Sequence, residues 1–389
     1  MRFNVYFQIC DKIIKTMGAG IKQAKEEVLP SLKGAKIDEA VQRGFDIPNF
    51  TIKEIRDAIP AHCFERDTLR SMSYVVHDFV IAGILFYLAS YIDSIPSFAL
   101  RMILWPVYWI CQGIVCTGLW VLGHECGHQG FSAIKVGPQY LNILYLAQNI
   151  NISVNYGMGI REFVGLPAKK NDPEGDGPHK LFDESPIMTL LDMIKIFTVG
   201  WPIYLLTHLS GQSYSEAWTS HFNPTCALFE KKQFWDVIQS IAGVATMISI
   251  LAYASKLYGS LAVIKFYVIP YLMVNFWLVL ITYLQHTDPK MPHYREGVWN
   301  FQRGAALTVD RSYGWILDYF HHHISDTHVA HHFFSTMPHY HAEEATKHIK
   351  KVLGKHYIFD PTPIPKALWR SWRECRFVED EGDVIFYKH

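Results

Sequence analysis

Three histidines with helical spacing are the residues of this sequence best suited to chemistry. His328, His331 and His332 stand at positions i, i+3 and i+4. On an α-helix these positions share one face, so three imidazoles would point into one small volume. Neutral imidazole is a good ligand for zinc, copper, iron and nickel. The spacing therefore predicts metal ligation rather than three unrelated surface histidines.

A second histidine cluster occurs much earlier in the chain. His124 and His128 are four residues apart, and Glu125 follows the first of them. His286 is a further imidazole at the end of an apolar run, and the chain contains 20 histidines in all. Two clusters beside apolar runs indicate a metal site at a membrane surface.

Long apolar runs are the elements that must position these clusters. Hydrophobic residues make up 50% of the chain and charged residues 19%, whereas soluble domains average about 25% charged. The runs 75–95, 102–122, 237–255 and 266–285 each have about the 20 residues that a membrane-spanning helix needs. We therefore predict an all-α integral membrane protein, with about four transmembrane helices in two hairpins and a cytosolic helical cap that carries the histidines.

A fifth apolar run leaves the topology open. Residues 187–209 include Asp192 and Lys195, so this run either crosses poorly or lies in the membrane interface. If it does not cross, His124 and His286 lie on the same side, since each directly follows a span. Basic residues precede the first span, which makes that side cytosolic by the positive-inside rule. We expect a cytosolic N-terminal region at 1–70 and a membrane domain at 71–389, with an atypical insert at 135–180.

Composition and cysteine usage exclude some classes. Lysine plus arginine equals aspartate plus glutamate, so the formal net charge is zero and nothing suggests nucleic-acid binding. The seven cysteines are scattered, odd in number and without a Cys-x-x-Cys pair, so we expect reduced thiols in or facing the cytosol.

The histidine clusters allow two enzyme classes. His124-Glu-x-x-His128 matches the helix of zinc metalloproteases, in which the glutamate is the general base. That pattern leaves the cluster at 328–332 unexplained, because a catalytic zinc site needs only about one more protein ligand. The surplus of histidines favours two metal ions and oxygen chemistry.

The same residues carry a resemblance to a known family. The chain resembles the membrane-bound acyl-lipid desaturases in the segments 124–129 (HECGHQ), 284–289 (LQHTDP) and 326–341 (DTHVAHHFFSTMPHYH). Within that family, these segments most resemble the fungal and plant Δ12 (oleate) desaturases. Segments 58–64 (AIPAHCF) and 71–76 (SMSYVV) also match. The resemblance covers 50–134 and 181–389. It does not distinguish Δ12 from omega-3 desaturation or from hydroxylation.

The resemblance implies a function and its partners. It implies an endoplasmic-reticulum protein with two non-haem iron ions, whose histidine boxes face the cytosol. Such a protein uses O2 and electrons from cytochrome b5 and its reductase to insert a cis double bond into the oleoyl chain of an acyl-phospholipid. Because no His-Pro-Gly-Gly haem motif occurs here, the electron donor would be a separate protein. An oligomer with itself or with other desaturases is also compatible with the family.

The resemblance also assigns roles to residues by position. Metal ligands are expected at His124, His128, His286, His328, His331 and His332. Outer-shell roles, in which a side chain orients a ligand, are expected at Glu125, Asp310, His322 and Asp326. No catalytic residue is expected beyond the metal ligands.

One departure from the family pattern affects every functional expectation. The family has a middle box, His-x-x-His-His, but no histidine lies here between His128 and His179. Six histidine ligands would therefore serve two metals. Glu162 or water could take the place of the missing middle-box ligands, whereas His179 is expected to be merely exposed. Residues 135–160 are rich in Asn, Ile and Tyr, which suggests translated intron or a replaced exon. We expect weak or absent activity with incompletely bound iron, and a catalytically inactive desaturase-like partner protein remains the alternative.

Overall fold

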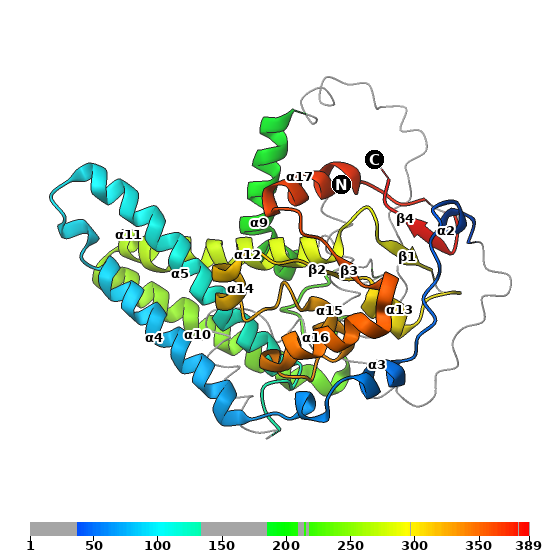
Figure 1. Cartoon of the computed structure of the whole chain (residues 1–389). Coiled ribbons are helices and arrows are strands. Elements are labelled where there is room, and N and C mark those ends of the chain that lie inside the picture. The colour runs from blue at the N-terminus through cyan, green and yellow to red at the C-terminus, as the bar shows by residue number, and fades with distance from the viewer. Residues whose placement is uncertain are drawn as a thin grey trace.

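The protein consists of a bundle of long apolar helices and a compact cap of short helices and strands (Figure 1). The computed structural model describes residues 37–133, 185–208, 214, 218–295, 297–379 and 381–388. The long helices are α4 (Thr68–Ala89), α5 (Phe98–Gly127), α9 (Pro186–Thr207), α10 (Phe234–Tyr258) and α12 (Ile269–His286). The predicted all-α membrane fold is confirmed, and the four expected spans coincide with α4, α5, α10 and α12.

Short helical segments connect or precede the long helices of each hairpin. The turn η2 (Ile92–Ser94) links α4 to α5, and η3 (Lys231–Gln233) precedes α10. The short helix α11 (Ser260–Val263) and the π-turn η4 (Ile264–Val268) lead from α10 into α12. Each hairpin is thus built from consecutive spans, as the sequence predicts.

The uncertain fifth run forms the complete helix α9. Among the described residues, five helices are long and apolar enough to cross a membrane by length and composition, and α9 is one of them. It packs against α12, where Asn275 Nδ2 donates a hydrogen bond to the Thr198 carbonyl oxygen at 3.1 Å. In Figure 1, α9 runs at a steep angle to α12.

Side chains at the helix starts explain why these helices begin where they do. Asp67 Oδ1 accepts the backbone N–H of Leu69 at 2.8 Å and so caps α4. Ser97 and Ser185 cap α5 and α9 in the same way, with Pro186 in the first helical turn of α9. These caps satisfy N–H groups that have no partner within the helix.

Two glycines allow α5 to approach its neighbours closely. A Cβ atom on Gly113 would lie 2.3 Å from Met273 Cβ on α12, and one on Gly118 would lie 2.2 Å from the Phe320 carbonyl oxygen. Both distances are far below van der Waals contact, so a larger residue at either position would force the helices apart.

The cap is assembled from both ends of the described chain. Its helices are α2 (Asp38–Gln42), α3 (Ile52–Ala58), η1 (Ala61–Phe64), α13 (Phe301–Ala306), α14 (Trp315–Phe320), α15 (His328–Phe333), α16 (His339–Leu353), η5 (Gly354–His356) and α17 (Ile364–Glu374). Strand β1 (Pro292–Tyr294) pairs antiparallel with β4 (Val384–Phe386), and β2 (Val309–Asp310) pairs parallel with β3 (Ile358–Phe359).

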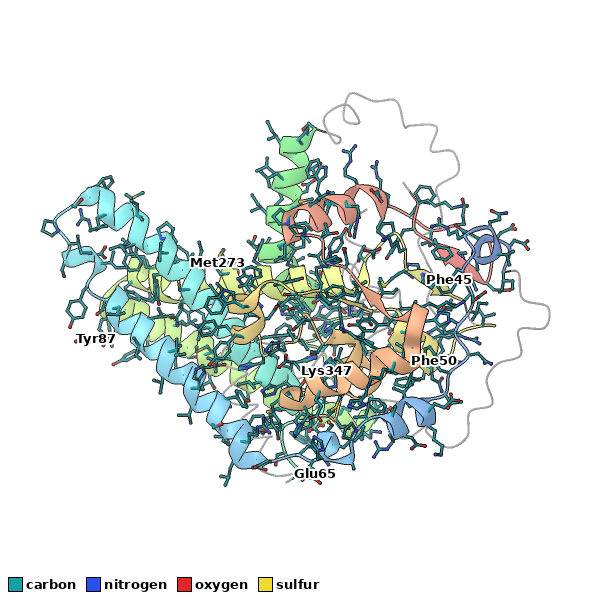
Figure 2. All side chains as sticks on the ribbon, viewed as in Figure 1. Phe45, Phe50, Glu65, Tyr87, Met273 and Lys347 are labelled. Atoms are coloured by element: carbon teal, nitrogen blue, oxygen red, sulfur yellow. The ribbon has the colours of Figure 1, made fainter. Side chains whose placement is uncertain are left out.

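Separate apolar cores hold the bundle and the cap. Leu119, Phe197 and Leu284 belong to the bundle core, whereas Ile55, Ala330 and Ile349 belong to the cap core. In Figure 2 the side chain of Tyr87 lies at the far end of the bundle, and Phe50 and Lys347 lie in the cap. The histidine clusters lie where the ends of α5 and α12 meet the cap.

Candidate metal centre

The first group of converging imidazoles, the α5 trio, joins the end of α5 to α15. His124 Nε2 lies 3.1 Å from His128 Nε2 and 3.0 Å from His331 Nε2. All three side chains are buried. The i, i+4 spacing on α5 brings two of the rings together, and the contact between α5 and the cap supplies the third.

The second group, the α12 trio, joins the end of α12 to the same short helix. His328 Nε2 lies 3.0 Å from His286 Nε2 and 3.2 Å from His332 Nε2. The rings of His328 and His331 are 5.8 Å apart between centroids, so the two trios are adjacent. The structure thus brings together all six histidines that the sequence marks as ligands.

Three of the candidate ligand rings have an outer contact at Nδ1, the ring nitrogen opposite Nε2. His331 Nδ1 lies 3.2 Å from Glu125 Oε1, and His328 Nδ1 lies 3.0 Å from the Ile324 carbonyl oxygen. His286 Nδ1 faces the Leu307 carbonyl oxygen at 3.5 Å. Such contacts orient an imidazole and leave Nε2 to a metal. The two backbone carbonyls carry no sequence signal, so sequence reasoning missed them.

Asp310 acts on the helix rather than on an imidazole. Its Oδ1 accepts the backbone N–H of Val329 at 2.8 Å, and its Oδ2 accepts the hydroxyl of Tyr357 at 2.5 Å. Asp310 therefore fixes the first turn of α15, which carries three of the predicted ligands. Burial raises the pKa of this carboxyl to about 7, although the hydrogen bonds from Tyr357 and Val329 oppose that shift.

The contacts found for His322 and Asp326 are not with ligand imidazoles. His322 Nε2 lies 2.7 Å from Asp78 Oδ2 on α4, and Asp326 Oδ2 lies 3.0 Å from His323 Nδ1. His322 and His323 both have left-handed φ angles, 50° and 59°. They form the turn between α14 and α15, a backbone conformation in which histidine is enriched.

Burial keeps three of the candidate ligand imidazoles in the form that binds metal. The pKa values of His128, His328 and His332 lie well below the usual histidine range, because burial and the neighbouring imidazoles disfavour the charged form. These rings are therefore neutral at neutral pH, with free lone pairs for a metal ion.

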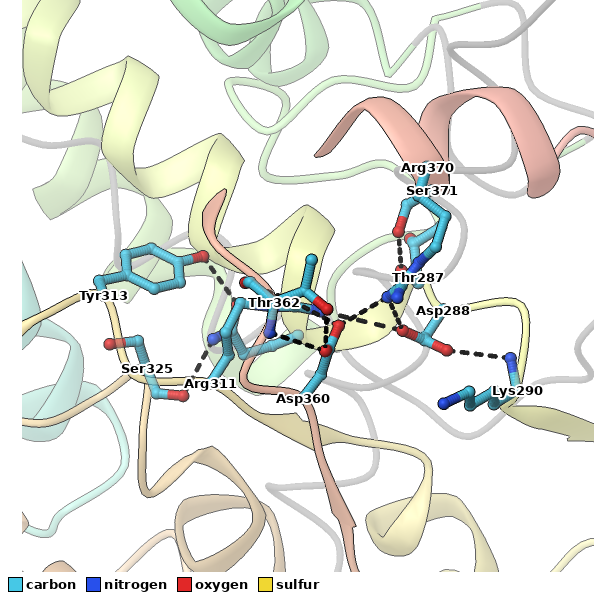
Figure 3. A network of polar contacts seen from close by, with 11 residues as sticks. Thr287, Asp288, Lys290, Arg311, Tyr313, Ser325, Asp360, Thr362, Arg370 and Ser371 are labelled. Carbon is cyan, nitrogen blue, oxygen red and sulfur yellow. Dashed lines mark hydrogen bonds and ion pairs between the residues drawn. The ribbon is translucent and has the colours of Figure 1, made fainter. Parts of the chain in front are cut away.

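A polar network holds the loop after α12 against the cap (Figure 3). Arg370 Nη2 donates to Asp288 Oδ2 and to Asp360 Oδ2, each at 2.6 Å, and Arg311 Nη1 donates to Asp360 Oδ2 at 2.5 Å. On the other side of the loop, Gln285 Nε2 donates to the Ser325 carbonyl oxygen at 2.9 Å. The network thus anchors the chain on both sides of His286, at Gln285 and at Asp288.

The buried carboxylate of Glu125 tests whether the trios fit a cation. Its side chain is 1% exposed; Oε1 lies 3.2 Å from His331 Nδ1 without hydrogen-bond geometry, and neither oxygen makes a hydrogen bond among the residues that the structure describes. A buried carboxylate without a donor is costly unless a positive charge lies nearby. A metal ion on His331 would supply that charge, so Glu125 and the three imidazoles of the α5 trio fit a cation.

Some expected features lie outside the described residues. Glu162, His179 and the whole atypical insert at 135–180 fall between 133 and 185, where nothing is described. Two further groupings that could hold a metal occur among the described residues: His62, Cys63, His341 and Glu344, and His323, Asp326 and Glu343. The sequence reading assigned no metal to either grouping.

Comparison with known proteins places these features in a family. A family model described as fatty acid desaturase matches residues 168–361, and one described as a domain of unknown function (DUF3474) matches residues 19–90. The chain is 50% identical to a "Delta(12) fatty acid desaturase" of Mortierella alpina, with 96% of this chain and 98% of the relative covered. It is 40% identical to an "Omega-6 fatty acid desaturase, endoplasmic reticulum" of Brassica juncea, with 94% and 96% covered.

Proposed function

Because the chain belongs to the fatty acid desaturase family, we propose that it inserts a cis double bond into an oleoyl-type acyl chain of a membrane lipid. The enzyme is then an acyl-lipid Δ12 (omega-6) desaturase, an oxidoreductase. The observation that carries this proposal is the pair of adjacent trios, six buried imidazoles at the end of an apolar bundle. The printed names of the Mortierella and Brassica relatives support the Δ12 position.

The trios would hold two non-haem iron ions. Iron with open coordination positions activates O2, which is the co-substrate of the reaction. The chain's own residues have simpler tasks: three imidazoles hold each ion, Glu125 and the Ile324 carbonyl orient two of the rings, and Asp310 fixes the helix that both trios share. Burial of the imidazoles keeps bulk water away from the centre.

The proposed partners follow from this chemistry. O2 reduction needs two external electrons, for which we propose cytochrome b5 and its reductase as the source. The substrate is an acyl-phospholipid, which the apolar bundle can receive from the bilayer. We propose a multi-pass location in the endoplasmic-reticulum membrane, with the trios facing the cytosol. The name of the Brassica relative supports this location.

The trios also support a topology. His124 ends the second span and His286 ends the last, yet the two trios to which they belong are adjacent. An even number of crossings must separate them, so α9, α10 and α12 cannot all cross. We propose that α9 lies in the membrane interface, where its exposed Ile187, Leu190 and Ile194 meet lipid. Residues 1–70 would form the cytosolic N-terminal region and 71–389 the membrane domain.

The missing middle box sets the expected level of activity. The family pattern would add a further group of histidines to the six, so each iron here has fewer imidazoles than the family provides. We expect the chain as written to bind iron incompletely and to be impaired. Sequencing the transcript across 135–180 tests whether this segment is translated intron: an uninterrupted message that encodes these residues contradicts that hypothesis.

Expression in yeast tests the function directly. New linoleate in cells that contain the protein would support Δ12 desaturation by the chain as written. A chimaera that carries a His-x-x-His-His segment in place of 135–160 tests the impairment, since it should produce more linoleate than the original. If neither the original chain nor the chimaera produces linoleate from oleate, although an immunoblot shows both proteins, the proposed activity is contradicted.

A second candidate is a catalytically inactive desaturase-like partner, which the missing box favours. Recovery of an active desaturase with this chain, and no iron in the purified protein, would support it. The zinc protease reading is disfavoured by geometry. In that mechanism Glu125 would act on a metal-bound water, but its carboxylate lies on the outer side of His331.

A further inference from the structure

A group of four metal-binding side chains lies apart from the trios, where η1 meets α16. We call it the η1–α16 cluster, and its members are His62, Cys63, His341 and Glu344. One ligand atom from each residue lies within 4.8 Å of all the others. His62 Nε2 is 2.9 Å from Glu344 Oε2 and 3.7 Å from Cys63 Sγ. Two helical segments far apart in the chain, η1 and α16, thus present four donors to one point.

The chemistry of the donors differs from that of the trios. One thiol, two imidazoles and one carboxylate are ligands that Zn²⁺ takes, and four is its usual number in structural sites. His341 and Glu344 stand at i, i+3 on α16, which places both side chains on the same face. Adjacent residues of η1 supply the other two donors.

The cluster is buried on its inner side and open to solvent on its outer side. Cys63 is fully buried in the cap core, together with Ala345 and Ile349. The side chains of His62 and Glu344 are 51% and 44% exposed. A metal ion can therefore enter from solvent and be held on the inner side by the thiol.

Charge balance also favours a divalent ion. A thiolate and a carboxylate together carry two negative charges, which one Zn²⁺ neutralises. Burial and the Glu344 carboxylate raise the pKa of the Cys63 thiol to about 11, so the thiol keeps its proton until a metal displaces it. Binding then releases this one proton to solvent, as is usual for cysteine ligands.

We propose that the η1–α16 cluster is a second metal site, which binds one zinc ion and links η1 to α16. The segment η1 directly precedes α4, and α16 packs on α15, the helix shared by the two trios. A bound ion would thus fasten the start of the bundle to the outer face of the cap. This site is separate from the proposed desaturase reaction and does not depend on it.

Cobalt binding by the full-length protein in detergent tests the proposal. Co²⁺ bound to a thiolate absorbs in the near ultraviolet by charge transfer, whereas Co²⁺ bound to imidazoles alone does not. After chelator treatment, we expect Co²⁺ to produce this band and Zn²⁺ to remove it. Cys63→Ser should abolish the band, and Glu344→Gln should weaken Co²⁺ binding at least several-fold.

Two matched variants serve as controls. Cys126→Ala removes the cysteine next to the α5 trio, and His348→Gln changes a histidine on α16 outside the cluster. Both should keep the band. The proposal is overturned if the wild-type protein shows no thiolate band, if the band survives Cys63→Ser, or if Zn²⁺ does not displace Co²⁺. Because the readout is optical, it is independent of any desaturase activity.

Discussion

The carboxylate of Glu125 lies 3.2 Å from the ring of His331, and both side chains are buried. Glu125 comes from the end of α5, whereas His331 comes from α15, more than two hundred positions later. The pair therefore ties the first histidine cluster to the last one. It also gives His331 a negative partner on the side opposite the proposed metal.

Glu125→Gln should weaken metal binding without removing a ligand. The amide keeps the shape of the side chain but loses the charge that polarises His331, and such outer contacts typically contribute about 10–100-fold to metal affinity. The measurement is iron affinity of the purified protein in detergent. Glu374→Gln on the exposed surface of α17 is the control and should bind like wild type. Equal affinity for Glu125→Gln and wild type would exclude the orienting role.

Each trio should hold its own metal. His331→Ala opens the α5 trio and His332→Ala opens the α12 trio, so each should lower the iron bound at saturation to about half of the wild-type amount. The double variant should bind almost none. Iron counted against protein, with His348→Gln as control, checks this. A single substitution that removes all iron would instead indicate one shared site.

Asp310→Asn should change how stability depends on pH. The carboxyl titrates near its ordinary value of 3.8 in the unfolded chain and at about 7 in the folded protein. The folded state holds the proton more tightly, so this group's contribution to stability is fully present below about pH 4 and is lost as the pH rises through 7.

The variant should therefore remove a slope of up to about 1.4 kcal/mol per pH unit between these values. The amide oxygen of the substituted side chain can still accept the Val329 N–H, so the first turn of α15 is retained. Thermal unfolding in detergent across this pH range gives the slope. Parallel curves for the variant and the wild type would show that Asp310 is not the responsible group.

Arg370→Met should destabilise the cap. The substitution removes the guanidinium that lies 2.6 Å from the buried Asp288 and leaves Arg311 Nη2 at 3.9 Å. We therefore expect a cost of at most about 3 kcal/mol, the value for a buried pair broken on one side. The network also holds the pKa of Asp360 well below its usual range: burial would raise it, but hydrogen bonds from Thr362 and Arg370 and the charge of Arg311 outweigh that effect.

The measurement for Arg370→Met is the unfolding midpoint in denaturant at pH 7. Lys366→Met, an exposed position on the same helix, is the matched control and should shift the midpoint little. Similar midpoints for the two variants would mean that the network of Figure 3 contributes no stability beyond its packing.

Local patterns in the sequence predicted the long apolar helices and the candidate ligands. An apolar run of membrane thickness has few alternatives to a helix, since a backbone in lipid must satisfy its own hydrogen bonds. Likewise, the i, i+3 and i+4 spacing around His331 can be recognised without knowing what faces it. The uncertain run at 187–209 shows the limit of this reasoning: composition predicts the helix α9 but not whether it crosses.

Contacts between distant segments came only from the tertiary structure. Nothing local indicates that α15 shares its histidines between His124 and His286, that Asp310 caps this helix, or that His322 pairs with Asp78 on α4. The same is true of Cys63 and Glu344, which lie far apart in the sequence and meet in the cap. The sequence by itself thus determined which residues can bind a metal and which segments are apolar. The tertiary structure decided how the residues are grouped, because grouping depends on packing between elements far apart in the chain.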